Sequence, residues 1–118
     1  TLQYIVVSDG THHAVFEKNR PGALQYTWSG SLWSANFKEY VPIIAFASST
    51  QGDATAAFDA AVTIAAKFRL GIEFPANAAY TISTNVYIKN GVKYLRGNGT
   101  SLTAQNMASG VTQEISFA

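Results

Sequence analysis

The second half of the chain is divided into very short β-like runs by turn-forming residues. The runs from residue 72 onward are IEF at 72–74, YTI at 80–82, VYI at 86–88, VKYL at 92–95, SLTA at 101–104 and EISFA at the end. The residues that separate them are those that favour turns, among them Pro75, Asn77, Asn90-Gly91 and Gly97-Asn98-Gly99. Hairpin proteins usually have longer strands, so the pattern favours a solenoid whose strands stack in parallel on the next coil.

One segment before these runs has helical periodicity instead. Its apolar residues recur at three- and four-residue spacing and define one face: Phe58, Ala61, Val62, Ala65 and Phe68. Asp53 is predicted to cap the first turn, and Gly71 to end the helix in the left-handed conformation. The residues alone leave two roles open: a lid over the open end of the solenoid, facing its interior, or an ordinary packing helix of an α+β fold.

Residues 1–50 have the pattern of short strands. Asp9-Gly10 predicts the turn of a hairpin from Leu2 to Glu17, and Ser29-Gly30 predicts the turn of a second hairpin. The segment YVPIIAFA at 40–47 is predicted to be an extended connector, with Pro42 keeping it out of a central strand position. We therefore expect a mainly β chain with a small β-rich N-terminal domain at 1–50, and a helix with parallel strands at 51–118.

Composition and charge exclude several classes of function. Charged residues make up only 13% of the 118 residues, the net charge is +1, and no basic run is longer than two residues. Such a chain has no electrostatic footprint for nucleic acid or an anionic membrane, so we expect no nucleic-acid partner. The apolar stretches are too short to span a bilayer, so no membrane insertion is expected. The absence of cysteine excludes disulfides and thiolate chemistry.

Residues 52–104 resemble the start of a right-handed parallel β-helix of the pectate-lyase-like type, as found in bacteriophage tailspikes. The matching features, in order, are Gly52-Asp53, the alanine-rich helix, Gly71, Phe74-Pro75, Tyr80-Thr81-Ile82, Gly91-Val92, Leu95, Gly97, Gly99 and Thr100. Two features depart from the family pattern. The stretch SSTQGDAT has one aspartate where a longer acidic run is usual, and IAFASS replaces the usual D-F-G-A connector. We therefore expect no metal site at Asp53.

This resemblance implies a role in the attachment of a phage to its host. It implies a mainly β fold in which an amphipathic helix caps the first rungs of the β-helix. The resembling proteins are usually homotrimers of the virion tail, and their N-terminal domain binds a tail, baseplate or adaptor protein. The β-helix would recognise and degrade bacterial surface polysaccharide. Two alternatives have the same solenoid: a secreted polysaccharide lyase or hydrolase, and a non-enzymatic structural or adhesion stalk.

The length of the second part indicates a fragment. Only 47 residues run from Ile72 to Ala118, which at roughly twenty residues per coil gives two coils where about three repeats are needed for stability. The chain also begins with Thr1 rather than methionine. We therefore expect these residues to belong to a longer protein.

No catalytic residue is predicted, and whether the full protein is a polysaccharide depolymerase, by hydrolase or lyase chemistry, is left open. Glycoside hydrolysis needs two carboxyl groups about 5 to 9.5 Å apart. The carboxylates here form no close pair in the sequence: Asp9, Glu17, Glu39, Asp53, Asp59, Glu73 and Glu114.

No cofactor and no metal site is predicted either. His12 and His13 are adjacent, and adjacent strand residues point to opposite faces, so they cannot readily share one ion. Tryptophan faces can stack on sugar rings, which makes Trp28 and Trp33 the candidates for carbohydrate binding. Core packing or a subunit interface explains these two tryptophans better.

Overall fold

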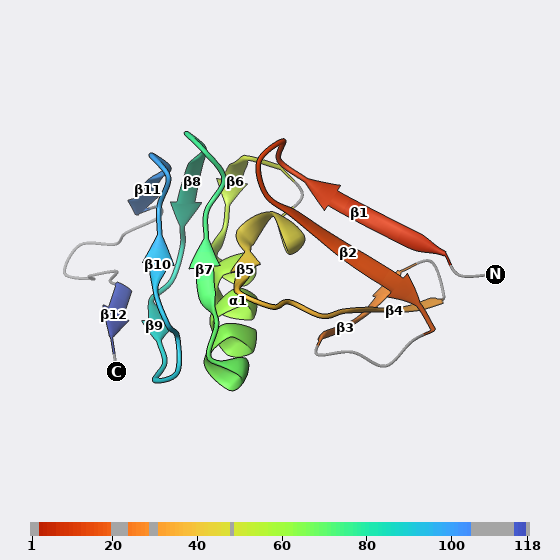
Figure 1. Cartoon of the computed structure of the whole chain (residues 1–118). Coiled ribbons are helices and arrows are strands. Elements are labelled where there is room, and N and C mark those ends of the chain that lie inside the picture. The colour runs from red at the N-terminus through yellow and green to blue at the C-terminus, as the bar shows by residue number, and fades with distance from the viewer. Residues whose placement is uncertain (1–2, 20–23, 29–30, 48, 105–114, 118) are drawn as a thin grey trace.

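The computed structural model describes residues 3–19, 24–28, 31–47, 49–104 and 115–117, with the backbone alone at 24–28 and 115–117. The described residues form a mainly β structure with small sheets and one α-helix (Figure 1). The elements are β1 (Tyr4–Ser8), β2 (His13–Lys18), β3 (Leu24–Trp28), β4 (Ser31–Ala35), β5 (Tyr40–Pro42), the 3-10 helix η1 (Ile43–Ala45), β6 (Gln51–Asp53), α1 (Thr55–Phe68), β7 (Gly71–Glu73), β8 (Ala79–Ile82), β9 (Val86–Ile88), β10 (Leu95–Arg96), β11 (Ser101–Ala104) and β12 (Ile115–Phe117).

The first four strands form one antiparallel sheet in the order β1-β2-β4-β3. β1 and β2 are joined by a turn at Gly10, whose φ of 91° is readily adopted by glycine, and β3 pairs with β4. Both predicted hairpin pairings are confirmed, although Ser29-Gly30 lies outside the described residues. One face of this sheet has a small core of its own, made by Ala14, Phe16, Trp33 and Ala35.

The strands from Tyr40 onward pair in parallel. β10, β7 and β5 form one sheet, β11, β8 and β6 form another, and β12 pairs with β9. The strands β10, β11 and β12 thus lie beside β7, β8 and β9 in the same order along the chain. Leu95 is opposite Ile72, and Leu102 is opposite Tyr80. The predicted parallel stacking of short strands is confirmed for these pairs.

The segment predicted to be an extended connector contains a strand and a 3-10 helix. β5 lies at the edge of its sheet, as expected from Pro42, and its Val41 is opposite Ile72. The extended prediction is wrong for η1, where Ile43 and Ile44 turn into the core. Because pairing changes from antiparallel to parallel before Tyr40, the parallel strands begin earlier than the predicted division at residue 50.

Two turns between the stacked strands have the same backbone conformation. Asn77, between β7 and β8, has a φ of 54°, and Asn98, between β10 and β11, has a φ of 53°. The backbone N–H of Asn77 donates to the carbonyl of Asn98 at 3.1 Å, and the Asn98 side chain donates to the carbonyl of Phe74 at 2.9 Å. Asparagine tolerates this left-handed region better than most residues, so the two turns stack and keep the strands in register.

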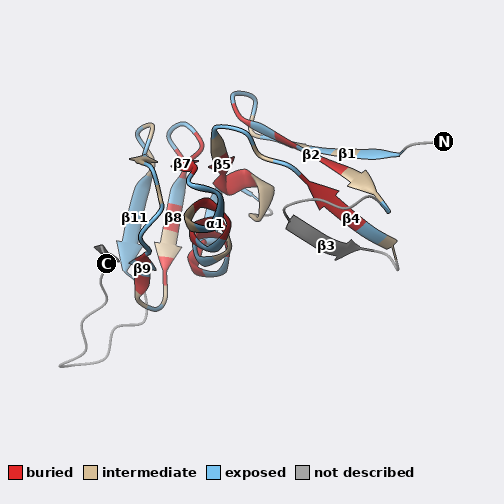
Figure 2. Cartoon of the chain, turned by 60° about the horizontal axis from the view of Figure 1, so that its bottom comes forward, coloured by how far each residue is buried: buried red, intermediate tan, exposed pale blue. Residues whose placement is uncertain are grey.

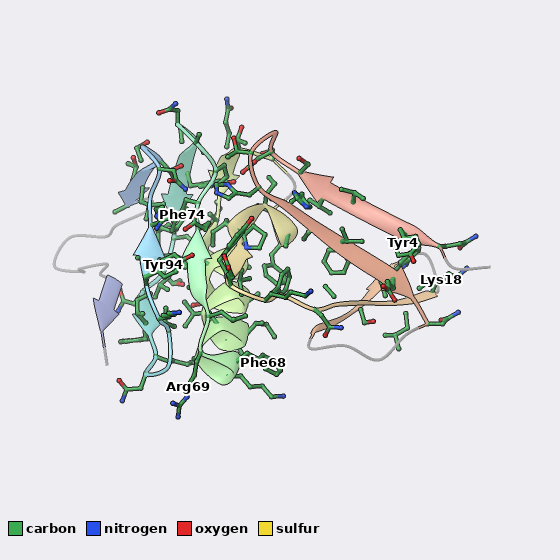
Figure 3. The ribbon with its side chains drawn as sticks, in the orientation of Figure 1. Tyr4, Lys18, Phe68, Arg69, Phe74 and Tyr94 are labelled. Atoms are coloured by element: carbon green, nitrogen blue, oxygen red, sulfur yellow. The ribbon has the colours of Figure 1, made fainter. Side chains whose placement is uncertain are left out.

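The helix α1 covers one side of the parallel strands (Figure 2). Its buried face contains Phe58, Val62 and Ala65, as the periodicity predicts, and the Phe58 ring meets Phe74 edge-on with centroids 5.1 Å apart. Phe68 was expected on the same face but is 42% exposed and points away from the strands (Figure 3). Ile64 is farther round the helix from Phe58 than Phe68 is, yet it is buried, so the helical angle does not explain this exposure. Phe68 is the last residue of α1, where the buried face ends.

The two predicted helix-end residues have different outcomes. Asp53 is not the N-cap of the helix, which is Ala54 and has no side-chain capping bond. The Asp53 carboxylate lies one residue earlier and accepts the backbone N–H of Thr55, the first helical residue, at 2.9 Å. Hydrogen bonds from Ser83 and then Thr55 lower the pKa of Asp53. At the other end the prediction is wrong, because Arg69 rather than Gly71 is left-handed, with φ 58° and ψ 52°. Gly71 belongs to β7, and its lack of a side chain leaves room for the Tyr94 ring.

Replacing Gly71 with alanine is expected to lower the free energy of unfolding by about 2 kcal/mol, because the added methyl group would overlap the Tyr94 ring. Gly97→Ala is the matched control, since no heavy atom lies within 4 Å of a Cβ built there. Urea unfolding measures both changes. A Tyr94→Ala background should remove most of the cost at position 71. Equal costs at positions 71 and 97 would contradict this account.

Candidate functional site

A buried group of charged and polar side chains joins the antiparallel sheet to the parallel strands. Asp9 and His12 lie in the turn between β1 and β2, whereas Glu73 lies in β7, 61 residues after His12. The side chains of Asp9, His12 and Glu73 are 2%, 9% and 4% exposed. Arg96 in β10 and Asn98 in the following turn complete the group. We call these five residues the joint cluster.

His12 is held between two carboxylates. Its Nδ1 is 3.2 Å from Oδ2 of Asp9, and its Nε2 is 3.0 Å from Oε1 of Glu73. The ring also meets Tyr40 edge-on, with ring centroids 5.6 Å apart. The ring is therefore held from both sides by groups of the turn and of β7.

Glu73 also has an ion-pair partner in β10 and a hydrogen-bond donor in the turn that follows β10. Nη1 of Arg96 lies 3.2 Å from Oε2 of Glu73, and the side-chain amide of Asn98 donates to Oε1 at 3.3 Å. Arg96 is largely exposed, and its guanidinium lies 5.1 Å from the centre of the Tyr94 ring. Burial, and then the negative charge of Glu73, raise the pKa of the Tyr94 phenol. A buried carboxylate requires such partners, because an unpaired charge is costly inside a protein.

Asp9 also closes the turn between β1 and β2. Its Oδ1 accepts the backbone N–H of Thr11 at 2.8 Å and that of His12 at 2.6 Å. Burial alone would raise the pKa of Asp9. The hydrogen bonds from these two backbone groups and from the His12 ring outweigh it and lower the pKa below the ordinary value of 3.8. The same carboxylate therefore shapes the turn and holds the histidine.

This arrangement is suited to holding two parts of the chain together. Both ring nitrogens of His12 face carboxylates, and Glu73 is enclosed by His12, Arg96 and Asn98. Across the described ranges, no group of three or more histidine, cysteine or acidic residues could hold a metal ion. The contacts of the cluster fix the position of the β1–β2 turn against β7, and we assign it a structural role.

Trp28 and Trp33 are the candidates for an exposed surface that binds carbohydrate, and the structure contradicts this for Trp33. Trp33 is 5% exposed and belongs to the core of the antiparallel sheet, so it is not part of an exposed platform. That hypothesis is wrong for Trp33, because the inner face of β4 packs there. The side chain of Trp28 lies outside the described residues. His12 is buried and His13 is exposed, as expected for adjacent residues.

Sequence reasoning did not find the joint cluster, because its members are far apart in the chain. Asp9 and Glu73 form no close pair in the sequence and come together only through His12. One signal was present: Glu73 is a charged residue in the apolar run Ile72–Phe74, all of which is buried. A charge in such a position requires a partner, although the sequence does not say which.

Comparisons of the chain with protein-family models, with curated proteins and with solved structures find no match. Within the part of the chain that the structure describes, no helix has the length and apolar character needed to cross a membrane. The resemblance of residues 52–104 to phage β-helices therefore stays a prediction, and a function has to be argued from the structure itself.

Replacing Glu73 with glutamine should lower the free energy of unfolding by about 2 kcal/mol or more, because His12 and Arg96 would lose a charged partner in a buried site. The matched control is Glu39→Gln, an exposed glutamate outside the joint cluster, where the change should stay within about 0.5 kcal/mol. Urea unfolding at neutral pH gives both values. A loss at position 73 no larger than that at position 39 would show that the cluster does not hold the two parts together.

The contribution of Asp9 should disappear in acid. The pKa of Asp9 is lower in the folded state than the ordinary value of 3.8 that it has in the unfolded chain. The ionised carboxylate therefore stabilises the fold at a pH above 3.8, and this stabilisation is lost as the pH falls through the folded-state pKa. Free energies of unfolding for the wild type and Asp9→Asn, measured between about pH 3 and pH 6, should differ near pH 6 and converge toward pH 3. A difference that stays constant over this range would refute the assignment.

Proposed function

We propose that this chain is the N-terminal anchoring and capping region of a phage tailspike, a virion tail protein that binds and degrades bacterial surface polysaccharide during host attachment. The observation that carries the proposal is the ordered parallel stacking: β10, β11 and β12 lie on β7, β8 and β9 in turn. Parallel stacking in this order is what a chain that returns to the same position after each coil would give, and the stacked asparagine turns support a parallel β-helix. The right hand of that helix is proposed from the family resemblance alone.

The position of α1 supports the capping role. β9 pairs with β12 and also contacts α1, which lies on its other side in Figure 1. The helix follows β6, in the place where the first coil would have its third strand, and its Phe58 and Val62 close the apolar interior. In contrast, all four residues of β11 are exposed, Leu102 by 36%. We propose that a further coil stacks on this strand.

The antiparallel sheet supports the anchoring role. It lies at the end of the molecule opposite to β11 and β12 (Figure 1), so it can bind a tail, baseplate or adaptor protein while the β-helix extends away. The joint cluster would hold the two parts at a fixed angle. From the family resemblance we also propose that the full protein is a homotrimer. The groups that cleave polysaccharide would lie in other coils, because no catalytic residue can be assigned among the described ones.

The complete protein tests this proposal. Incubated with purified surface polysaccharide from its host bacterium, it should shorten the polymer, measured by size-exclusion chromatography, and light scattering should give the mass of a trimer. Binding without shortening would favour the non-enzymatic stalk. Shortening by a protein that antibodies do not detect in purified virions would favour the secreted enzyme. A stable monomer that binds no polysaccharide would contradict all three functions.

A further inference from the structure

The outer strand of the antiparallel sheet is an open edge without charge. β1 is the first strand of the sheet, and β2 is its only partner among the described residues. Its sequence, YIVVS, contains no charged residue and no proline. Proteins normally block such edges with charges, prolines, bulges or a covering segment. β1 therefore offers a row of backbone groups to which another strand could bind.

The hydrogen-bond pattern shows which backbone groups face this edge. The N–H of Asp9 donates to the carbonyl of His12 at 3.1 Å, which makes these two residues a hydrogen-bonded pair. In an antiparallel pair, residues whose backbone groups bond to the partner strand alternate with residues whose backbone groups point away from it. Every second residue before Asp9 therefore bonds to β2, and the backbone groups of the residues between them point away from β2. The N–H and C=O groups of Tyr4, Val6 and Ser8 therefore face the free edge. Tyr4 and Val6 are 53% and 61% exposed.

An apolar groove lies on the inner side of the same strand. It has a volume of about 570 Å³ and lies between the antiparallel sheet, the η1 segment and α1. No charged residue lines it, and its lining includes Ile5 and Val7 from β1, Ile44 and Phe46 from the η1 segment, and Ala56 and Ala60 from α1. Side chains alternate between the two faces of a strand. A strand added beside β1 would therefore direct every second side chain toward this groove.

We propose that β1 binds an extended segment of a partner protein as a fifth strand of the sheet. The segment would pair with the outward backbone groups of Tyr4, Val6 and Ser8, and place uncharged apolar side chains at alternate positions in the groove. An uncharged segment is required because neither β1 nor the groove lining offers a charge to match. The inference rests on the proposed function only in making this partner a virion protein.

A different protein fits this edge better than a second copy of the chain. Two copies paired through β1 about a two-fold axis would join their antiparallel sheets to each other. Their parallel strands would then extend in opposite directions, because the parallel strands lie to one side of β1 (Figure 1). In such a dimer the β1 edge would be occupied, whereas the proposed function requires the antiparallel sheet to bind a virion protein.

A synthetic peptide can probe the edge directly. A suitable probe is a peptide of about nine residues that alternates threonine with valine and ends in glycine and two lysines for solubility. The control is the same peptide N-methylated at alternate residues, which cannot complete the ladder. At saturating peptide, amide exchange followed by NMR should slow by about tenfold or more at Tyr4, Val6 and Ser8. Ile5 and Val7 already bond to β2 and should change by less than about twofold.

Two substitutions, each with a control, test the edge and the groove separately. Val6→Lys places a charge at the edge and should weaken binding about tenfold, whereas Tyr87→Lys, at an equally exposed apolar residue of β9, should not. Ala56→Phe fills the groove from α1 and should weaken binding to a similar extent. Thr63→Phe adds the same ring at an exposed position of α1 that does not line the groove. Circular dichroism checks that each variant is folded.

Three results would overturn this proposal. The first is equal binding of the N-methylated peptide, and the second is no binding at about 1 mM peptide. The third is a concentration-dependent dimer of the wild type that Val6→Lys abolishes, since a second copy would then occupy the edge. None of these results affects the polysaccharide assay. A tailspike whose β1 edge binds nothing and a strand-binding protein without polysaccharide activity are therefore distinguishable outcomes.

Discussion

Parallel pairing of very short strands is the constraint on which most of this structure depends. A strand such as β7 or β9 has three residues and can make few backbone hydrogen bonds by itself. It is held because it stacks on another strand and buries its inward side chains, as Ile72 and Val86 show by being fully buried. The chain must then return to the same place after each coil. The left-handed turns at Asn77 and Asn98 meet this requirement.

The first of the stacked strands have no further parallel strand beyond them among the described residues, and other parts of the chain pack against this end of the stack. Apolar groups do so at one place and polar groups at another. The closure is apolar where α1 contacts β9 and where its buried Phe58 meets Phe74. Beside β7 it is polar, because Glu73 meets His12 of the antiparallel sheet. Buried polar contacts of this kind add less stability than well-packed apolar groups would, but they require their partners in a defined geometry. We infer that the joint cluster mainly determines how the hairpin is oriented against the parallel strands.

Features set by neighbouring residues were predictable from the sequence, whereas features set by distant residues were not. Alternation and turn residues gave both hairpins and most of the short strands, and the three- to four-residue spacing gave the helix. The frequent use of glycine at helix ends predicts that Gly71 adopts the left-handed conformation, but Arg69 adopts it instead. A contact with Tyr94, which no local rule contains, is what requires glycine at position 71. The pairing of His12 with Glu73 depends equally on tertiary packing.

The open edge and the joint cluster belong to one hairpin, and this connection gives the antiparallel sheet a defined mechanical role. Asp9 follows β1 directly and binds His12, which binds Glu73 in β7. A strand bound along β1 would therefore be attached to an element whose end is fixed to the parallel strands. Its orientation would pass to the parallel strands through buried side chains. Protonation of Asp9 would loosen this connection, because the same carboxylate closes the turn after β1 and holds His12.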